Sequence, residues 1–540
     1  MVGETASDDG EDEGRDTDVE AAAQALADAI RTTLGPNGMD KMVVGENGTV
    51  IVTNDGASIL DWMDITHPVG RVVERVAAAQ DDTVGDGTTA TVVLAGALVD
   101  AAATLRGDGL HPTTIVDGYV RAAEMAAERL EQYELTVDSR HDDRLNHVAQ
   151  TAVTGRWDDA STRRFADLTL EALQAVDFDT SKLTLKSYPG GELRESACLD
   201  GIVVDLESSS TSLDGIGHEQ RRNIEAPTVA MVDGEIGIPE PDQVESVQFE
   251  SASQREAFQR HERAVRSDVV AAVTDAGGTV LCCQKSIDET VQTALAQRGV
   301  LPVERVRRDE FDVIARATGS SPVPSPEELS VADTGTVDAV RQRTVGTTDT
   351  LLLQGCPGEK RVSLLLRGGT PHVAEEVRRI VADCIDVTRV SLDDGALLPG
   401  GGAVPAGLAM ELTASARGIS DRRQLVFDGF ASALEAVPRT LASNAGADPI
   451  DVLTKLKQRR DAGSTTVGVG PEGQPCEMVE AGVLEPSTVF RSALQRAVAV
   501  ATMLLRIDEM VRVDSGEAAD AGHDGHSHAA TGGYPWAVGH

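Results

Sequence analysis

The spacing of apolar residues predicts a helix near the start of the chain. Apolar side chains recur every three or four positions, which places them on one face of a helix. They are Val19, Ala23, Leu26, Ile30 and Leu34. Gly35-Pro36 follows and is a typical helix stop. Residues 1–18 are strongly acidic and carry no apolar periodicity, and we expect them to be disordered.

Strand and helix patterns share the rest of the first 140 residues. A β-rich run at 49–52 leads into Asn54-Asp55-Gly56, which is typical of a tight turn between strands. Ala-rich apolar segments, one beginning at Thr88 and one from Ile115 to Leu130, predict two long helices. This part of the chain is therefore expected to be mainly helical.

Short β-branched runs identify the middle of the chain, about 201–366, as an α/β module. The runs alternate with helical segments and are 201–204, 228–232 and 279–282. Helical spacing returns at 371–392 and dominates 403–460. The tail at 514–540 contains Gly, Ala, Asp and His without periodicity, so we expect it to be disordered.

The composition indicates a large protein whose core is built from small aliphatic residues. A chain of 540 residues is expected to form roughly two to four domains. Apolar residues make up 41% of the chain but aromatic residues only 3%, so Ala, Val, Leu and Ile must fill the interior. The expected fold class is multidomain α/β.

The net charge of −40, from 88 acidic and 48 basic residues, argues against a nucleic-acid partner. Such general acidity is typical of proteins in a high-salt cytoplasm, where salt screens the repulsion between like charges, and it suggests adaptation to high salt. Six cysteines without a CxxC pair fit a reducing compartment. No signal peptide and no run of 18 apolar residues occurs, so we predict a cytoplasmic protein without a membrane partner.

Gly85-Asp86-Gly87-Thr88-Thr89 has the properties of a phosphate-binding loop. Small residues lead directly into an apolar helix, whose first backbone amides can bind a phosphate group. An aspartate between two glycines places a carboxylate where Mg²⁺ can bridge to phosphate oxygens. The simpler alternative is that Thr88 or Thr89 only caps the helix.

Two other segments have both a functional and a structural explanation. Gly400-Gly401-Gly402 precedes a helix and either permits close approach of a ligand or acts as a flexible linker. Asp383 lies at the border of the apolar face of its predicted helix, so it faces either a functional domain boundary or an interfacial salt bridge.

Two apparent motifs are rejected. Gly468–Gly473 matches the GxGxxG spacing, but Pro471 and the polar residues after it do not open a helix, so we expect a hairpin. His523, His526 and His528 lie in the expected disordered tail, where adventitious metal binding is the better interpretation. The sequence contains no GxxxxGK[ST], which excludes a P-loop.

Seven motifs follow one another along the chain in an order that resembles the group II chaperonins, the family of the archaeal thermosome and its eukaryotic cytosolic relatives. They are TLGPNGMDKM at 33–42, VTNDGASIL at 52–60, GDGTT at 85–89, RGGT at 367–370, GALLPGGGA at 395–403, PRTLASNAGADPID at 438–451 and ATMLLRIDEMV at 501–511. The resemblance covers roughly residues 18–512.

The resemblance implies a subunit of three domains formed by nested insertion. It assigns an equatorial ATPase domain to 19–142 and 396–513, an intermediate hinge domain to 143–208 and 367–395, and an apical substrate-binding domain to 209–366. Residues near 243–265 occupy the place of a helical protrusion that acts as a built-in lid.

The resemblance also implies a role for each candidate site residue. Asp86 corresponds to the Mg²⁺ ligand, and Asp55 and Asp383 correspond to the carboxylates that position the attacking water. Contacts with adenosine are implied for Gly401 and Glu485, and contacts with phosphate for Thr33, Leu34, Gly35, Pro36, Gly56, Gly87, Thr88 and Thr89. Arg156 stands where the family has a γ-phosphate-sensing lysine, and this departure puts nucleotide sensing in question.

The implied function is that of an ATPase chaperone subunit in a closed double ring. Unfolded protein clients would fold in the chamber, with identical or paralogous subunits as ring partners, ATP and Mg²⁺ as cofactors, and K⁺ as an activating ion. Phosphoryl transfer requires positioning and charge neutralisation, which carboxylates and glycines can supply. The alternatives are an ATP-independent holdase or structural ring and, less well supported, a soluble metabolic kinase.

Overall fold

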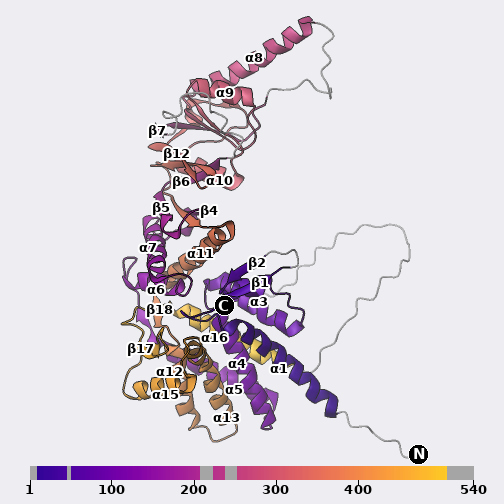
Figure 1. Ribbon diagram of the computed structural model, residues 1–540, viewed down its shortest axis with the longest axis vertical. Helices are drawn as coiled ribbons and strands as arrows, with labels where there is room; N and C mark the ends of the chain where they lie inside the picture. The colour runs from indigo at the N-terminus through magenta and orange to yellow at the C-terminus, as the bar shows by residue number, and fades with distance from the viewer. Residues whose placement is uncertain (1–8, 46–49, 207–222, 238–251, 508–540) are drawn as a thin grey trace, which may run out of the picture. The chain divides into compact units, whose positions relative to one another are not determined.

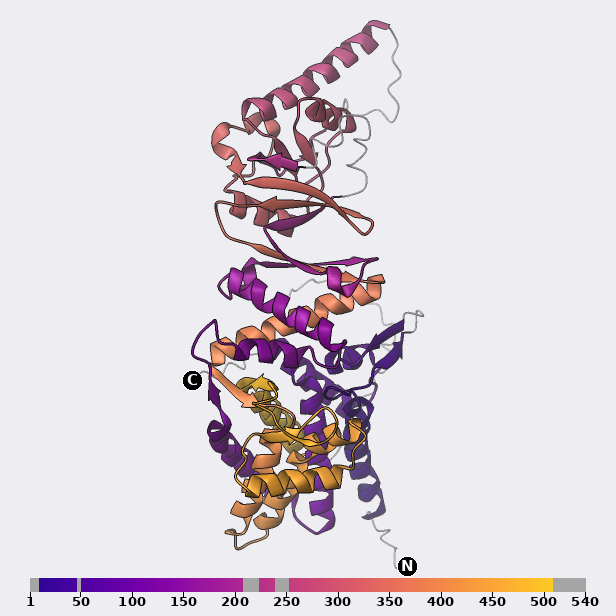
Figure 2. The same cartoon turned by 60° about the vertical axis from the view of Figure 1, so that its left-hand side comes forward.

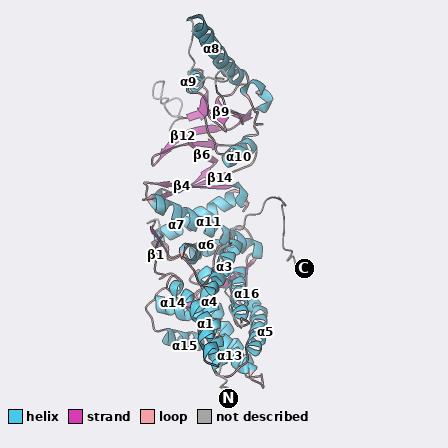
Figure 3. Cartoon of the chain, turned by 90° about the vertical axis from the view of Figure 1, so that its right-hand side faces the viewer, coloured by secondary structure: helices cyan, strands magenta, loops and turns pink. Residues whose placement is uncertain are grey.

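Helices dominate both ends of the chain and strands its middle in the computed structural model, which describes residues 9–45, 50–206, 223–237 and 252–507 (Figures 1 and 3). The described chain up to Arg506 forms one compact unit. The predicted tail at 514–540 lies outside the described residues. The division into three domains stays a prediction, because this unit is not divided further.

Helix α4 (Thr88–Gly107) forms the centre of the helical part. It packs against α1 (Asp9–Arg31), α3 (Pro68–Val84), α13 (Arg423–Leu434) and α16 (Ser487–Leu504), so segments from both ends of the chain share one core (Figure 1). Among the described residues, α4 is the one helix that is long and apolar enough to cross a membrane. Its burial between other helices explains this apolar composition.

The other elements of the helical part include the predicted helix α5 and the predicted hairpin β16–β17, and both predictions are confirmed. The helices are α2 (Gly56–Trp62), α5 (Pro112–Leu130), α12 (Ala403–Ala416), α14 (Ala436–Asn444) and α15 (Pro449–Asp461). The strands are β1 (Lys41–Val44), β2 (Val50–Thr53), β3 (Leu135–Thr136), β15 (Ala396–Pro399), β16 (Val467–Val469), β17 (Pro475–Glu477) and β18 (Leu484–Pro486). They form the pairs β1–β2 and β16–β17 and the sheet β18-β15-β3.

The predicted start of the first helix is wrong. We expect disorder up to residue 18, but α1 begins at Asp9 and ends at Arg31, three residues before the last predicted apolar position. The N-terminus of a helix carries partial positive charge and favours acidic residues. The acidic composition that suggests disorder is therefore also compatible with the first turns of α1.

The predicted turn between strands at Asn54-Asp55-Gly56 is also wrong. Asp55 is instead the N-cap of α2, and its Oδ2 accepts a hydrogen bond from the amide of Ser58 at 2.7 Å. Asn and Asp favour turns and N-caps for the same reason, because their short side chains bond to nearby backbone amides. The local pattern alone does not separate these two structures.

Two sheets of the middle part confirm the α/β prediction. The sheet β10-β9-β8-β11 comprises β8 (Thr228–Val232), β9 (Val280–Cys283), β10 (Leu301–Val303) and β11 (Gly335–Thr336). The antiparallel sheet β6-β13-β12-β7 comprises β6 (Ile202–Leu206), β7 (Asn223–Glu225), β12 (Ala339–Val345) and β13 (Thr348–Gln354). The helices of this part are α8 (Ala252–Asp275), α9 (Glu289–Gln297) and α10 (Arg308–Thr318).

Alternate residues of β8 explain how these elements pack. Val229 and Met231 share a core with β6 and α10, whereas Ala230 and Val232 share a second core with α8 and α9. Both faces of the strand are thus covered, as its continuous apolar run indicates. The predicted lid segment near 243–265 is described only from residue 252, where it forms the first turns of α8, and 243–251 lie outside the described residues.

A third sheet, β4-β14-β5, is formed by segments that lie between the helical part and the α/β elements along the chain. It comprises β4 (Leu183–Pro189), β5 (Ala197–Asp200) and β14 (Val362–Gly368), so segments far apart in the chain lie side by side (Figure 2). Helices α6 (Arg144–Ala152), α7 (Asp159–Ala175) and α11 (Pro371–Asp394) share its apolar core. Short 3₁₀ turns occur at Glu131–Tyr133, Thr180–Lys182, Leu193–Glu195, Pro326–Glu328 and Val331–Asp333.

Candidate functional site

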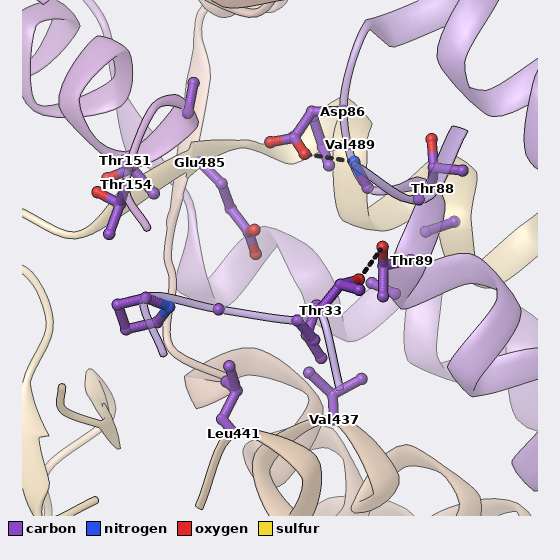
Figure 4. Close-up of a pocket in the computed structure, with 18 of the residues that line it drawn as sticks. Thr33, Asp86, Thr88, Thr89, Thr151, Thr154, Val437, Leu441, Glu485 and Val489 are labelled. Atoms are coloured by element: carbon purple, nitrogen blue, oxygen red, sulfur yellow. Dashed lines mark hydrogen bonds between the residues drawn. The ribbon is translucent and has the colours of Figure 1, made fainter. Parts of the chain in front are cut away.

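A cavity of about 260 Å³ is lined by the ends of α2, α4 and α12, the loop after α1, and parts of α11, α16 and β18. Every predicted site residue lines this cavity, and Figure 4 shows Thr33, Asp86, Thr88, Thr89 and Glu485 among them. They are Thr33, Leu34, Gly35, Pro36, Asp55, Gly56, Asp86, Gly87, Thr88, Thr89, Arg156, Asp383, Gly401 and Glu485. The fold thus brings together residues from seven separate segments of the chain, although the role of each one stays a prediction.

The N-terminus of α4 opens on the cavity through the loop Gly85-Asp86-Gly87. Gly87 is the N-cap, with φ +82°, and a Cβ there would lie 2.8 Å from Cγ1 of Val489, so only glycine fits. Neither threonine that follows caps the helix: Oγ1 of Thr88 is buried without a hydrogen-bond partner, and Oγ1 of Thr89 lies 3.4 Å from Oγ1 of Thr33. The helix-cap alternative is therefore wrong, and the free first amides form a site suited to an anion.

Asp86 is the carboxylate closest to this helix N-terminus in sequence. Its Oδ1 accepts a hydrogen bond from the amide of Gly87 at 2.6 Å, and burial raises the pKa of its carboxyl group despite that bond. In the part of the chain that the structure describes, no three Cys, His, Asp or Glu side chains are grouped to hold a metal by themselves. Mg²⁺ commonly needs only one or two carboxylates because phosphates and waters supply the other ligands, so Asp86 fits this metal.

Asp55 and Asp383 reach the cavity from different elements. Oδ2 of Asp55 lies 2.8 Å from Nη1 of Arg379, and its Oδ1 lies 3.5 Å from Nη2 of Arg156. Burial acts to raise the pKa of Asp55, but the two guanidinium groups and the amide of Ser58 hold that pKa below its usual value. The carboxyl group of Asp55 is therefore ionised at neutral pH.

The pKa of Asp383 is shifted in the opposite direction. Burial raises the pKa of its carboxyl group to about 8, and the carboxylates of Asp55 and Asp81 act in the same direction against Arg379. The side chain is 29% exposed, which confirms its predicted position at the border of the apolar face of α11. The two carboxyl groups thus differ in proton affinity within one pocket.

Arg156 faces the same cavity from the loop after α6. Its Nη1 donates a hydrogen bond to Oδ1 of Asn54, and Nδ2 of Asn54 donates to the carbonyl of Gly155 at 3.0 Å. Asn54 therefore fixes both the backbone and the side chain of this loop. The side chain is only 18% exposed and its guanidinium group is directed at Asp55, so Arg156 is not an ordinary surface cation.

The triple-glycine segment and Glu485 form another wall of the cavity. Gly401 has φ +59°, and a Cβ there would lie 2.5 Å from Sδ of Met478. Glu485 lies beside this segment because β18 pairs with β15, which places Glu485 opposite Leu398. Burial, with a contribution from Asp86, raises the pKa of Glu485 to about 8. Apolar side chains complete the lining, among them Pro405, Val437, Leu441, Val489 and Phe490.

Several residues at the cavity were not predicted. Asp81 lines it, and burial followed by the charge of Asp55 raises its pKa to about 6. Asn54 lies inside a recognised motif, and Arg379 precedes Asp383 by one helical turn, so these two could have been found from spacing. No sequence signal distinguishes Asp81 from the exposed acidic residues of helices.

Comparison with known proteins extends this picture to the whole chain. Residues 26–515 match the model of the TCP-1/cpn60 chaperonin family. Thermosome subunit alpha of Halobacterium salinarum is 38% identical over 495 residues, covering 91% of this chain and 87% of the relative. A thermosome subunit of Methanopyrus kandleri is 38% identical over 499 residues, covering 91% and 90%. One from Pyrococcus horikoshii is 35% identical over 513 residues, covering 93% and 92%.

The family match spans all seven sequence motifs, and the matches confirm both the resemblance and the chaperonin fold. The chain belongs to the TCP-1/cpn60 chaperonin family and is a subunit of a group II chaperonin.

Proposed function

We propose that the cavity binds and hydrolyses Mg-ATP, and that hydrolysis drives the folding of unfolded proteins inside a closed double ring with a built-in lid. The chain is an ATP-dependent chaperonin subunit of an assembly of identical or paralogous subunits. The observation that carries the proposal is the meeting of an anion-binding helix N-terminus with three acidic side chains, Asp55, Asp86 and Asp383, in one pocket. A cytoplasmic location and activation by K⁺ stay predictions.

Phosphate binding is assigned to the loop after α1 and to the start of α4. The free amides after Gly87 and the unpartnered hydroxyl of Thr88 can donate to phosphate oxygens. Held by Asp86, Mg²⁺ would neutralise negative charge on those oxygens. The apolar wall and the turn at Gly401 leave room for the adenosine portion of ATP, beside the carboxyl group of Glu485.

Asp55 and Asp383 are assigned to the attacking water. An ionised carboxylate can orient a water molecule and accept its proton, and a carboxyl group with a pKa near neutrality is well matched to general base catalysis. Asp383 belongs to α11, whereas Asp55 belongs to α2, so a movement of α11 relative to α2 would assemble or open the site. Hydrolysis would in this way be coupled to closure.

Refolding of a chemically denatured enzyme tests the proposed function. We expect recovery of its activity only when the purified assembly, Mg²⁺ and ATP are all present. The holdase alternative predicts that aggregation is suppressed but that ATP restores no activity. A structural ring predicts neither effect.

Arg156→Ala tests the assignment of Arg156 to γ-phosphate sensing. A guanidinium group can bind two phosphate oxygens at once and stays protonated at all useful pH values. We expect the variant to bind ATP and to hydrolyse it substantially, but to close abnormally. Closure would be followed by protease sensitivity of 243–265 with ATP present. Arg163→Ala, which removes an exposed arginine on α7, is the matched control, and closure of Arg156→Ala like the control would refute the sensing role.

The net charge of −40 predicts that assembly depends on salt. Electrostatic repulsion extends over about 10 Å at 0.1 M salt but only about 3 Å at 1 M. We expect the assembly to dissociate, or its subunits to unfold, as salt falls from molar to millimolar concentration. Size-exclusion chromatography with light scattering at each salt concentration measures this, with sucrose as a control for general effects of cosolute. An intact assembly in millimolar salt contradicts the prediction.

A further inference from the structure

Arg379 lies between the two carboxyl groups that are assigned to the attacking water. Its Nη1 is 2.8 Å from Oδ2 of Asp55 and 3.3 Å from Oδ2 of Asp383. Its Nη2 donates a hydrogen bond to Oε1 of Glu376 at 2.9 Å. Arg379 is not among the residues that line the cavity, so it reaches these groups from behind.

The two carboxyl groups need such a cation because they are close and poorly hydrated. The side chains of Asp55 and Asp383 are 12% and 29% exposed, and a cation at short range favours the ionised form of a carboxyl group where water is largely excluded. Asp81 and Asp86 add further negative charge around Asp55 and Asp383. Within the described residues, Arg379 is the one cation within salt-bridge distance of both carboxyl groups.

A second set of hydrogen bonds fixes Arg379 relative to α2. Oε1 of Glu376, which accepts from Arg379, also accepts from Oγ1 of Thr53 at 2.8 Å. The same hydroxyl of Thr53 accepts from the amide of Asp55 at 3.1 Å. Arg379, Glu376, Thr53 and Asp55 thus form a closed chain of polar contacts that joins α11 to the start of α2.

We propose that Arg379 is a positioning residue for hydrolysis, which holds Asp55 and Asp383 at the separation needed to orient one water molecule. It acts through the two carboxylates and touches neither nucleotide nor metal. This inference rests on the proposed ATP hydrolysis. Arg156 cannot replace it, because Arg156 is within salt-bridge distance of Asp55 but not of Asp383.

Steady-state kinetics of Arg379→Met test the proposal, since methionine keeps much of the length of the side chain but removes its charge. Because small displacements of catalytic groups can cost about 100-fold in rate, we expect kcat to fall by about that factor. KM for ATP should change little, since the cavity wall is untouched. Arg379→Lys should recover part of kcat. Arg378→Met is the matched control. Arg378 directly precedes Arg379 in α11, its side chain is 42% exposed, and it pairs only with Glu375. The kcat of this variant should equal that of the wild type.

Melting temperatures without nucleotide provide a second readout that needs no activity. We expect Arg379→Met to lower the melting temperature, because it leaves the buried, ionised carboxylate of Asp55 without its nearest cation. Adding Asp55→Asn to this variant should raise the melting temperature again, whereas Asp55→Asn alone should not raise it, because it leaves Arg379 without this partner. A purely structural role for Arg379 predicts additive changes without this reversal.

Three results would overturn the inference: a wild-type kcat for Arg379→Met, a loss of ATP binding equal to the loss of kcat, or no reversal by Asp55→Asn. If Arg379→Met does not fold, Arg379→Gln replaces it with the same expected kcat and KM. Absence of ATP turnover in the wild-type chain would overturn the proposed function as well. Normal turnover in the wild type together with a fully active Arg379→Met would overturn only the role of Arg379.

Discussion

Asp86→Ala is expected to abolish Mg²⁺-dependent ATP hydrolysis almost completely. Asp86 is the carboxylate between the two glycines that precede α4, and no described group of three metal-binding side chains can replace it. Without a held metal, the charge on the phosphate oxygens is not neutralised and the nucleotide is not oriented. Release of phosphate at saturating ATP, over a range of Mg²⁺ concentrations, measures the effect.

A matched variant separates this loss from general damage to α3 and α4. Asp82→Ala removes an exposed aspartate from α3, four residues before Asp86, and should keep wild-type turnover. Burial raises the pKa of Asp86, which means that its ionised carboxylate destabilises the folded state. The melting temperature of Asp86→Ala should therefore not drop sharply. Wild-type turnover in Asp86→Ala would rule out this residue as the metal ligand.

Asp383→Ala is expected to bind ATP normally but to lose roughly 100- to 10,000-fold in hydrolysis, the range typical for loss of a general base. Asp383 lines the cavity from α11 and does not belong to the phosphate-binding loop, so its removal should leave nucleotide affinity unchanged. Binding of a fluorescent ATP analogue and single-turnover hydrolysis measure the two properties separately. Loss of binding would instead indicate a structural role.

Asp393→Ala is the matched control for this variant. Asp393 belongs to the same helix, is 63% exposed and pairs with Arg389 at 2.7 Å outside the cavity. We expect its turnover to equal that of the wild type. Reduced turnover in this control would mean that α11 tolerates no loss of charge, and the specific role of Asp383 would have to be withdrawn.

The helical framework of the site could be predicted because it follows from local rules. Apolar spacing placed α4, α5 and α11, and small residues before α4 and α12 indicated helix starts that open on a ligand. The strands at 228–232 and 280–283 were also evident, because β-branched and apolar residues fill them continuously. These elements depend little on distant parts of the chain.

The errors arose where one local sequence supports two structures. Asn54-Asp55-Gly56 satisfies both a turn and an N-cap, and the choice depends on α2 packing against α3 and α4. The acidic segment before Val19 likewise suits both a disordered chain and a helix N-terminus. Only contacts made elsewhere decide between such alternatives.

The electrostatics of the site could not be predicted from the sequence. Asp55 and Arg379 are far apart along the chain, and their contact depends on how α11 packs on α6 and α3. The same packing buries Asp383, so that its pKa differs from that of Asp55 although both are aspartates. Chemistry that depends on burial requires the tertiary structure.

The most direct test of the account is ATP turnover measured across a size-exclusion profile of the purified protein in molar salt, with and without chelation of Mg²⁺. We predict that turnover coincides with a particle much larger than one chain and disappears when Mg²⁺ is removed. A large particle without ATP turnover, or turnover that persists without divalent metal, would contradict the central claim that this cavity is the Mg-ATPase site of a ring-forming chaperonin.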